Sequence, residues 1–346
     1  MTSLLDRVYT VLANREHYFQ DGWGEREAFP YLLKANPREF HRREVPDISL
    51  RWGPGRIQED VTIREGWFDS PYRFVWKDGR KTITNVLPDE ANRALVQMIL
   101  PRPWKADMPL AIHFAATGDE GFNRRRVSMA MPLARRGIGS VILENPFYGE
   151  RRPSWQKGSL IREFSEFMRM SRAAMDEGIA LARKLREEGY GPLGFTGISM
   201  GGYIALAAAG RAGFPMAVGA CIPTHCASAV YLDGALRRAC AWEKLNESMP
   251  NGATFKGLSA PEDAPELMRS IMSLGDIRHF PMPKRPDAVV ILGAKHDHYI
   301  PRYSTEIIHE HLTGSVLRWL DTGHVGTFVF HRNECNETVI EAFDRL

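Results

Sequence analysis

The strongest constraint on the fold is a regular alternation of strand-like and helix-like segments that begins near residue 108. Short apolar runs, each suited to a strand buried on both faces, are separated by segments with helical spacing of their apolar residues. This alternation is typical of a parallel sheet with crossover helices, and it predicts an α/β fold. The predicted strands are 109–116, 140–144, 193–196, 217–222, 288–292 and 316–320, and the predicted helices include 129–136, 164–188, 203–209 and 305–312.

The first part of the chain follows a different pattern. Residues 1–55 read as an irregular helical lead-in, which the Gly22-Trp23-Gly24 segment interrupts. Three β-rich runs follow, at 61–63, 72–76 and 95–100. We therefore predict a lead-in of residues 1–55 and a main domain of residues 56–346.

A long segment without predicted strands separates two of the predicted strands of the main domain. Residues 223–286 contain two helix-like stretches, 235–246 and 265–274. Insertions of this length usually cover a functional site. We predict a small helical cap at about 223–286.

Composition excludes several classes of protein. The 45 Lys and Arg residues against 42 Asp and Glu give a net charge of +3, too balanced for a protein whose main role is to bind nucleic acid. No apolar run approaches the ~20 residues of a membrane span. The N-terminus lacks the apolar core of a signal peptide and is too acidic for a transit peptide, which predicts a cytoplasmic protein.

The sharpest chemical signal is the segment Gly197-Ile198-Ser199-Met200-Gly201, followed by Gly202. It lies between a predicted strand and a predicted helix, which is the context of a nucleophile elbow. Glycines two residues before and after the serine avoid collisions in such a tight turn. The Met200 amide would then point to the same side as the serine oxygen and stabilise an oxyanion. The alternative is a glycine-rich turn without chemistry.

A serine nucleophile needs a base, and the base needs an orienting acid. In this arrangement the acid and then the histidine follow later strands of the sheet. Asp297 comes after the strand 288–292, and His324 comes after the strand 316–320. The predicted triad is Ser199, Asp297 and His324, with Asp321 as the second choice for the acid.

Other candidate residues follow the ends of further predicted strands. The second oxyanion donor is predicted to be the amide of Thr117, with Ala116 as second choice. Phe147, Tyr148 and Arg151 are predicted to bind substrate. The Arg151 guanidinium would suit a phosphate or carboxylate, although a salt-bridged surface pair with no role in binding is the alternative.

Two His-x-His pairs, His296 with His298 and His309 with His311, raise the question of a metal. Zinc needs three or four convergent ligands, whereas these pairs fall in a predicted loop and at a helix end. We interpret them as solvated or packing histidines and expect no metal and no cofactor.

Several of these segments together resemble the α/β-hydrolase superfamily, and within it the branch named for alpha/beta hydrolase domain-containing protein 18. The resemblance implies an eight-stranded, mostly parallel sheet and a Ser199–Asp297–His324 triad that works without metal or organic cofactor. The sequence departs from the superfamily where Ala115-Ala116 replaces the usual His-Gly before the oxyanion loop. The resembling segments are Gly22-Trp23-Gly24, Thr117-Gly118-Asp119, 143–149, 197–202, 295–301 and Gly323-His324.

These observations predict a serine hydrolase that cleaves a small-molecule or lipid-like carboxylic ester through an acyl-enzyme on Ser199. Thioester cleavage, amide cleavage and acyl transfer use the same groups and stay open as alternatives. A catalytically silent scaffold that binds a small ligand under its cap, and metal-dependent hydrolysis at the His-x-His pairs, are alternatives from other classes.

Overall fold

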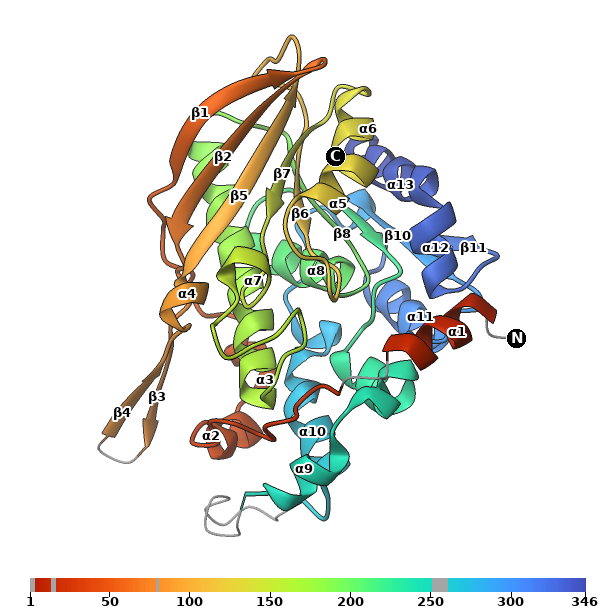
Figure 1. Ribbon diagram of the computed structural model, residues 1–346. Coiled ribbons are helices and arrows are strands. Elements are labelled where there is room, and N and C mark those ends of the chain that lie inside the picture. Colours follow the sequence, from red (N-terminus) through yellow and green to blue (C-terminus); the bar gives the residue numbers. More distant parts are fainter. Residues whose placement is uncertain (1–3, 14–16, 79–80, 251–260) are drawn as a thin grey trace.

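A single large sheet runs through the computed structural model, with helices packed on both of its faces (Figure 1). The structure describes residues 4–13, 17–78, 81–250 and 261–346. The sheet has nine strands in the order β1-β2-β5-β7-β6-β8-β9-β10-β11. These strands are β1 (Arg51–Gln58), β2 (Val61–Asp69), β5 (Arg93–Pro101), β6 (Leu110–Phe114), β7 (Gly139–Leu143), β8 (Leu193–Ile198), β9 (Ala217–Cys221), β10 (Val289–Ala294) and β11 (Val316–Leu320).

The strands from β6 to β11 are all parallel, whereas β1, β2 and β5 pair in antiparallel fashion at one side. The parallel strands are the ones predicted from the helix–strand alternation, so the α/β architecture is confirmed. Their carboxyl ends meet at one edge of the sheet. Loops that carry binding or catalytic residues lie at this edge in open α/β sheets.

Helices cover the two faces of the sheet with separate hydrophobic cores. On one face α7 (Phe164–Glu187) and α8 (Met200–Ala212) pack together over Phe114 and Phe195. On the other face α13 (Arg332–Asp344) packs over β9 and β10. Strands buried on both faces explain why the parallel strands are continuous apolar runs.

The strand count differs from the sequence prediction at two places. The run at 72–76 belongs to a separate hairpin of β3 (Phe74–Asp78) and β4 (Lys81–Asn85) instead of the central sheet. Strand β1 was not predicted, and with it the sheet has nine strands where eight were expected. Its sequence, with two glycines and a proline, lacks the alternation of a half-buried strand, because β1 is a mostly exposed edge strand.

The described residues of the predicted cap form helices and loops but no strand, and residues 251–260 lie outside the described part. Trp23 of the predicted lead-in is fully buried, and its indole N–H donates to the Leu245 carbonyl of the cap at 2.8 Å. The lead-in and the cap therefore share one hydrophobic core with the start of α7. The division at residue 55 stays a prediction. Helices of the cap are η3 (Ala229–Asp233), η4 (Ala235–Ala239), α9 (Trp242–Glu247) and α10 (Ala264–Met272).

The remaining helices connect strands or lie in the lead-in. None of the helices in the described residues is both long enough and apolar enough to span a membrane. Their bounds are α1 (Leu4–Ala13), α2 (Phe29–Lys34), α3 (Pro37–Phe40), α4 (Asp89–Asn92), α5 (Asn123–Arg125), α6 (Met131–Ala134), α11 (Arg302–His311) and α12 (His324–Phe330).

Candidate active site

Ser199 stands in a sharp turn between β8 and α8, as the glycine pattern predicts. Its backbone has φ 57° and ψ −118°, a conformation that a residue with a side chain seldom adopts. A Cβ atom on Gly197 would lie 2.6 Å from the Gly201 carbonyl oxygen, and one on Gly201 would overlap the Phe114 carbonyl oxygen. Both glycines are therefore required by close backbone contacts, and the turn has the geometry of a nucleophile elbow.

The structure brings Asp297 and His324 together. Asp297 follows β10, His324 follows β11, and the Asp297 Oδ2 to His324 Nδ1 distance is 2.7 Å. The other oxygen, Oδ1, accepts hydrogen bonds from the amides of Tyr299 and Ile300, both at 2.8 Å. Because the carboxylate is almost fully buried and both of its oxygens are engaged, it holds the imidazole in one orientation.

The charge around His324 makes its imidazole more basic. Burial of the ring disfavours the protonated form, but the carboxylate of Asp297 and, more weakly, that of Asp6 favour it. The sum raises the pKa of His324 above its ordinary value of 6.5. A base of this strength suits the removal of a proton from a hydroxyl group near neutral pH.

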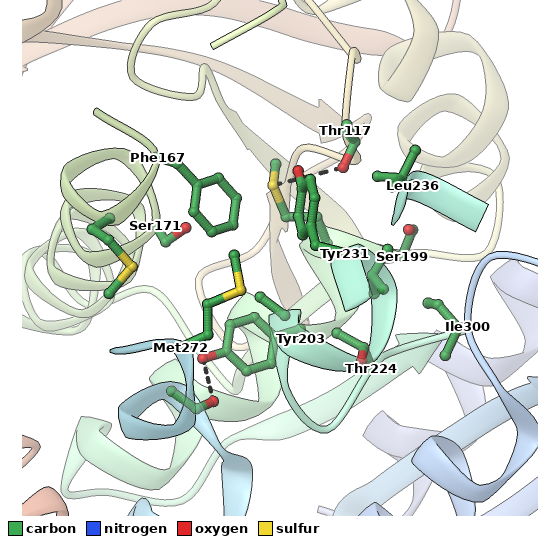
Figure 2. A pocket seen from close by; sticks show the side chains of 15 residues that line it. Thr117, Phe167, Ser171, Ser199, Tyr203, Thr224, Tyr231, Leu236, Met272 and Ile300 are labelled. Carbon is green, nitrogen blue, oxygen red and sulfur yellow. Dashed lines mark hydrogen bonds between the residues drawn. The ribbon is translucent and has the colours of Figure 1, made fainter. Parts of the chain in front are cut away.

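Ser199 lies on the wall of a mostly apolar pocket that is lined in part by cap residues (Figure 2). Ile300, whose amide donates to Asp297, lines the same pocket, whereas Asp297 and His324 do not themselves line it. The Ser199 hydroxyl makes no hydrogen bond to any described residue. In the absence of substrate such contacts are often long and close only in the substrate complex. The pocket is lined by Thr117, Phe167, Met168, Ser171, Ser199, Met200, Tyr203, Thr224, Ala227, Val230, Tyr231, Leu236, Met272, Gly275 and Ile300.

Thr117 and Met200 face this pocket together. The Thr117 hydroxyl lies 3.9 Å from the Met200 sulfur, and Met200 is the first residue of α8, where amides lack intrahelical acceptors. Thr117 lines the pocket whereas Ala116 does not, which favours the first choice of the sequence prediction. Helix N-termini also favour negative charge, so the place beside Ser199 suits an oxyanion.

Buried polar contacts hold the loop that carries Thr117. The Gly118 amide donates to the Tyr148 hydroxyl at 3.3 Å, and Asp119 forms a 2.9 Å ion pair with Arg125. Arg125 also donates to the carbonyls of His113 and Leu143, at the ends of β6 and β7. Sequence reasoning missed Arg125, because nothing in its local pattern marks it as buried.

The residues predicted to bind substrate do not reach the pocket. Phe147, Tyr148 and Arg151 are each at most 1% exposed, and none of them lines the pocket. The Arg151 guanidinium donates to Glu177 at 2.6 and 2.8 Å, and to the carbonyls of Ala91 and Glu144. Because its donors are engaged inside the protein, we correct the prediction: Arg151 stabilises the fold, and Tyr148 supports the Thr117 loop.

The buried pair leads to a stability prediction. Glu177→Gln should lower the free energy of unfolding by about 3–5 kcal/mol, because it leaves the Arg151 charge buried without its partner. Glu337→Gln, which breaks a mostly exposed pair with Arg136, is the matched control and should cost at most ~1 kcal/mol. Guanidinium unfolding curves measure both. Equal losses in the two variants would contradict the structural role of the pair.

The remaining candidates are separate from the pocket. Asp321, the second choice for the acid, is largely exposed, and its carboxylate pairs with His296 at 2.9 Å instead of His324. The His309 ring bonds to the Ser315 hydroxyl. Within the described ranges, no group of three or more His, Cys, Asp or Glu residues is placed to hold a metal ion.

Sequence reasoning also missed Asp6. Its buried carboxylate accepts hydrogen bonds from the amides of His298, His324 and Val325, so it touches both loops of the acid–base pair. An isolated acidic residue in a helix-like segment carries no local signal for such a contact.

Comparison with solved structures gives esterases as structural relatives. Acetyl xylan esterase 1 from Thermoanaerobacterium sp. JW/SL YS485 has a TM-score of 0.54 at 14% identity, covering 96% of this chain and 98% of the esterase. The acetyl xylan esterase from Paenibacillus sp. R4 has a TM-score of 0.55 at 13% identity, covering 93% and 96%. Est1E from Butyrivibrio proteoclasticus, with ferulic acid bound, has a TM-score of 0.52 at 13% identity, covering 73% and 96%. At these identities the likeness concerns the fold, and it agrees with an α/β-hydrolase fold.

The sequence itself gives the closer assignment. The model of the family described as alpha/beta hydrolase domain containing 18 matches residues 16–259 and 253–345, which is most of the chain. The match includes the segments that carry Ser199, Asp297 and His324. The chain therefore belongs to the alpha/beta hydrolase domain containing 18 family.

Proposed function

We propose that this member of the family is a serine hydrolase that cleaves a carboxylic ester through an acyl-enzyme on Ser199. One observation carries the proposal: a strained Ser199 on the pocket wall follows β8, and a buried Asp297–His324 pair, with 2.7 Å between Oδ2 and Nδ1, follows β10 and β11 at the same carboxyl edge of the sheet. Family membership supports a hydrolase.

Each group has a defined step in this mechanism. His324 Nε2 removes the proton of the Ser199 hydroxyl as the oxygen attacks the ester carbonyl, while Asp297 holds the Nδ1–H side of the ring. The amides of Met200 and Thr117 stabilise the tetrahedral oxyanion. When it collapses, protonated His324 gives its proton to the leaving alcohol. In the second half, His324 removes a proton from water as the water oxygen attacks the acyl-enzyme carbonyl. The bond to the Ser199 oxygen then breaks, protonated His324 returns the proton to that oxygen, and the carboxylic acid is released.

The pocket supports an apolar acyl group, and with it a small-molecule or lipid-like ester as the substrate. Aromatic and aliphatic side chains from α7 and the cap, among them Phe167, Tyr231, Leu236 and Met272, face the space beside Ser199 (Figure 2). Burial of a methylene group stabilises a bound acyl chain by ~0.8 kcal/mol. Two of the structural relatives are acetyl xylan esterases, which agrees with an ester as the scissile group. The predicted cytoplasmic location stays a prediction.

A panel of nitrophenyl esters of increasing acyl length tests the proposal. We expect nitrophenol release from the intact enzyme, with a kcat/KM that rises as the acyl chain fills the pocket. Matched thioesters and anilides distinguish the thioesterase and amidase alternatives, and an added alcohol acceptor reveals acyl transfer. Folded enzyme that releases no acid from any ester, while it still binds the esters, would indicate the silent scaffold instead.

The raised pKa of His324 predicts the pH dependence of this reaction. The imidazole must be neutral to accept the serine proton, so kcat/KM should fall as the pH falls through the pKa of His324. Because that pKa is raised, the midpoint of this acidic limb should lie above 6.5. Initial rates between about pH 5 and pH 8 measure it. A midpoint clearly below 6.5 would contradict the assigned environment of the imidazole.

A further inference from the structure

The N-terminal helix α1 lies against the acid–base end of the candidate site. It contacts α12, which begins at His324, and η4 of the cap (Figure 1). On this helix Asp6 is fully buried, while Leu4 and Val8 are more than half exposed. The Asp6 carboxylate therefore lies in the protein interior and not in solvent.

The carboxylate of Asp6 accepts three amide hydrogen bonds from two separate loops. Oδ2 accepts from His298 at 2.9 Å and from His324 at 2.8 Å, and Oδ1 accepts from Val325 at 2.9 Å. His298 directly follows Asp297 in the chain. One carboxylate thus links the backbone beside the acid to the backbone of the base. The two hydrogen bonds join Asp6 to backbone amides 292 and 318 positions later in the chain.

The cap is tied to the same place. The Ala235 amide at the start of η4 donates to the His298 carbonyl at 3.1 Å, so both backbone groups of His298 are engaged. A Cβ atom on Gly234 would overlap the Tyr299 carbonyl oxygen, which shows how closely the cap approaches this loop. The loop that holds Asp297 is therefore hydrogen-bonded to α1 on one side and to the cap on the other.

We propose that Asp6 is a positioning residue for the acid–base pair: from α1 it fixes the loop after Asp297 against the first turn of α12, and so sets the orientation of His324 toward Ser199. Hydrogen bonds with an ionised acceptor are about twice as strong as neutral ones, and three of them converge here. This inference rests on the proposed hydrolase function, because its readout is the reactivity of Ser199.

The test compares Asp6→Asn with Asp21→Asn in the full-length chain. Asn at position 6 has nearly the same shape, but it loses the charge and one acceptor atom. Asp21 pairs with Arg162 at the surface of the same N-terminal region and contacts neither loop, so it is a matched control. The measured quantity is the second-order rate of Ser199 labelling by a fluorophosphonate probe, together with kcat/KM for an ester, across the pH range.

We expect Asp6→Asn to lower both rates by about 10²-fold, since small displacements of reacting groups cost that much. It should also move the acidic limb of the pH–rate profile to lower pH, because the carboxylates of Asp297 and Asp6 favour protonated His324. The ring of Tyr299 also lies beside that of His324, with 5.1 Å between the ring centroids. A role in stability alone would reduce the folded fraction without moving the limb. The proposal would be overturned if Asp6→Asn had the same labelling rate, the same kcat/KM and the same midpoint of the acidic limb as Asp21→Asn.

Asp6→Glu keeps the test decisive if Asp6→Asn does not fold. It retains the charge but displaces the carboxylate by one methylene group. We therefore expect the acidic limb to have the same midpoint as in the wild type, with a reduced kcat. An Asp6→Glu variant with the kcat of the wild type would overturn the proposal. Failure of the hydrolase proposal itself looks different, because the wild type would then give no probe adduct on Ser199 and would hydrolyse the ester no faster than Ser199→Ala.

Discussion

Ser199→Ala is expected to lose ester hydrolysis almost completely, with kcat reduced by about 10⁶-fold. The reason is that the Ser199 oxygen forms the covalent bond to the acyl group, and in this account no other side chain replaces it as the nucleophile. The other hydroxyl side chains of the pocket come from Thr117, Ser171, Tyr203, Thr224 and Tyr231. The Tyr203 hydroxyl donates to the Gly275 carbonyl at 2.7 Å, and the Thr224 hydroxyl donates to the Cys226 carbonyl.

Stopped-flow and steady-state assays of nitrophenol release measure this loss. Ser128→Ala is the control, because the Ser128 hydroxyl donates to the Arg124 carbonyl and the residue does not line the pocket. It should keep the activity of the wild type. A Ser199→Ala variant with more than a few per cent of wild-type kcat would show that the reaction does not proceed through this hydroxyl.

Asp297→Asn is expected to lower kcat by about 10⁴-fold while the fold is retained. The asparagine keeps the size of the side chain and can still accept the amides of Tyr299 and Ile300. Its amide, however, favours the tautomer of His324 with the proton on Nε2, which cannot accept the serine proton. His324→Gln should cost still more, because it removes the base itself.

Asp321→Asn is the matched control for the acid. Asp321 precedes His324 by three residues but pairs with His296 in solvent, so the variant should keep wild-type kcat. The same steady-state assay compares the two carboxylates. If Asp321→Asn lost the activity and Asp297→Asn kept it, the 2.7 Å contact between Asp297 and His324 would not be the one that matters for catalysis.

The parts of this account that the sequence predicted are those with a local signal. The glycines around Ser199 are required by close backbone contacts, and Ser199, Asp297 and His324 each lie within four residues of the end of β8, β10 or β11, which the apolar pattern predicted. Because the carboxyl ends of parallel strands share an edge, a correct list of strands was enough to bring the three residues to one side of the sheet.

The parts that the sequence did not predict depend on long-range burial. Arg151 has the appearance of a binding residue in a loop, but its partner Glu177 lies on α7, and only the packed structure shows that both are buried. Asp6 is fully buried on a helix where Leu4 and Val8 are more than half exposed, and two of its partners lie 292 and 318 residues away in the chain. Strand β1 is an exposed edge, where neither face needs a continuous apolar pattern.

The most direct test of the central claim is the site of covalent labelling by a fluorophosphonate probe, mapped by mass spectrometry of peptides from the wild-type protein. The account predicts one probe per chain, attached to Ser199, and strongly slowed labelling in His324→Gln. No adduct on the folded protein, or an adduct on another residue of the pocket such as Ser171, would contradict it.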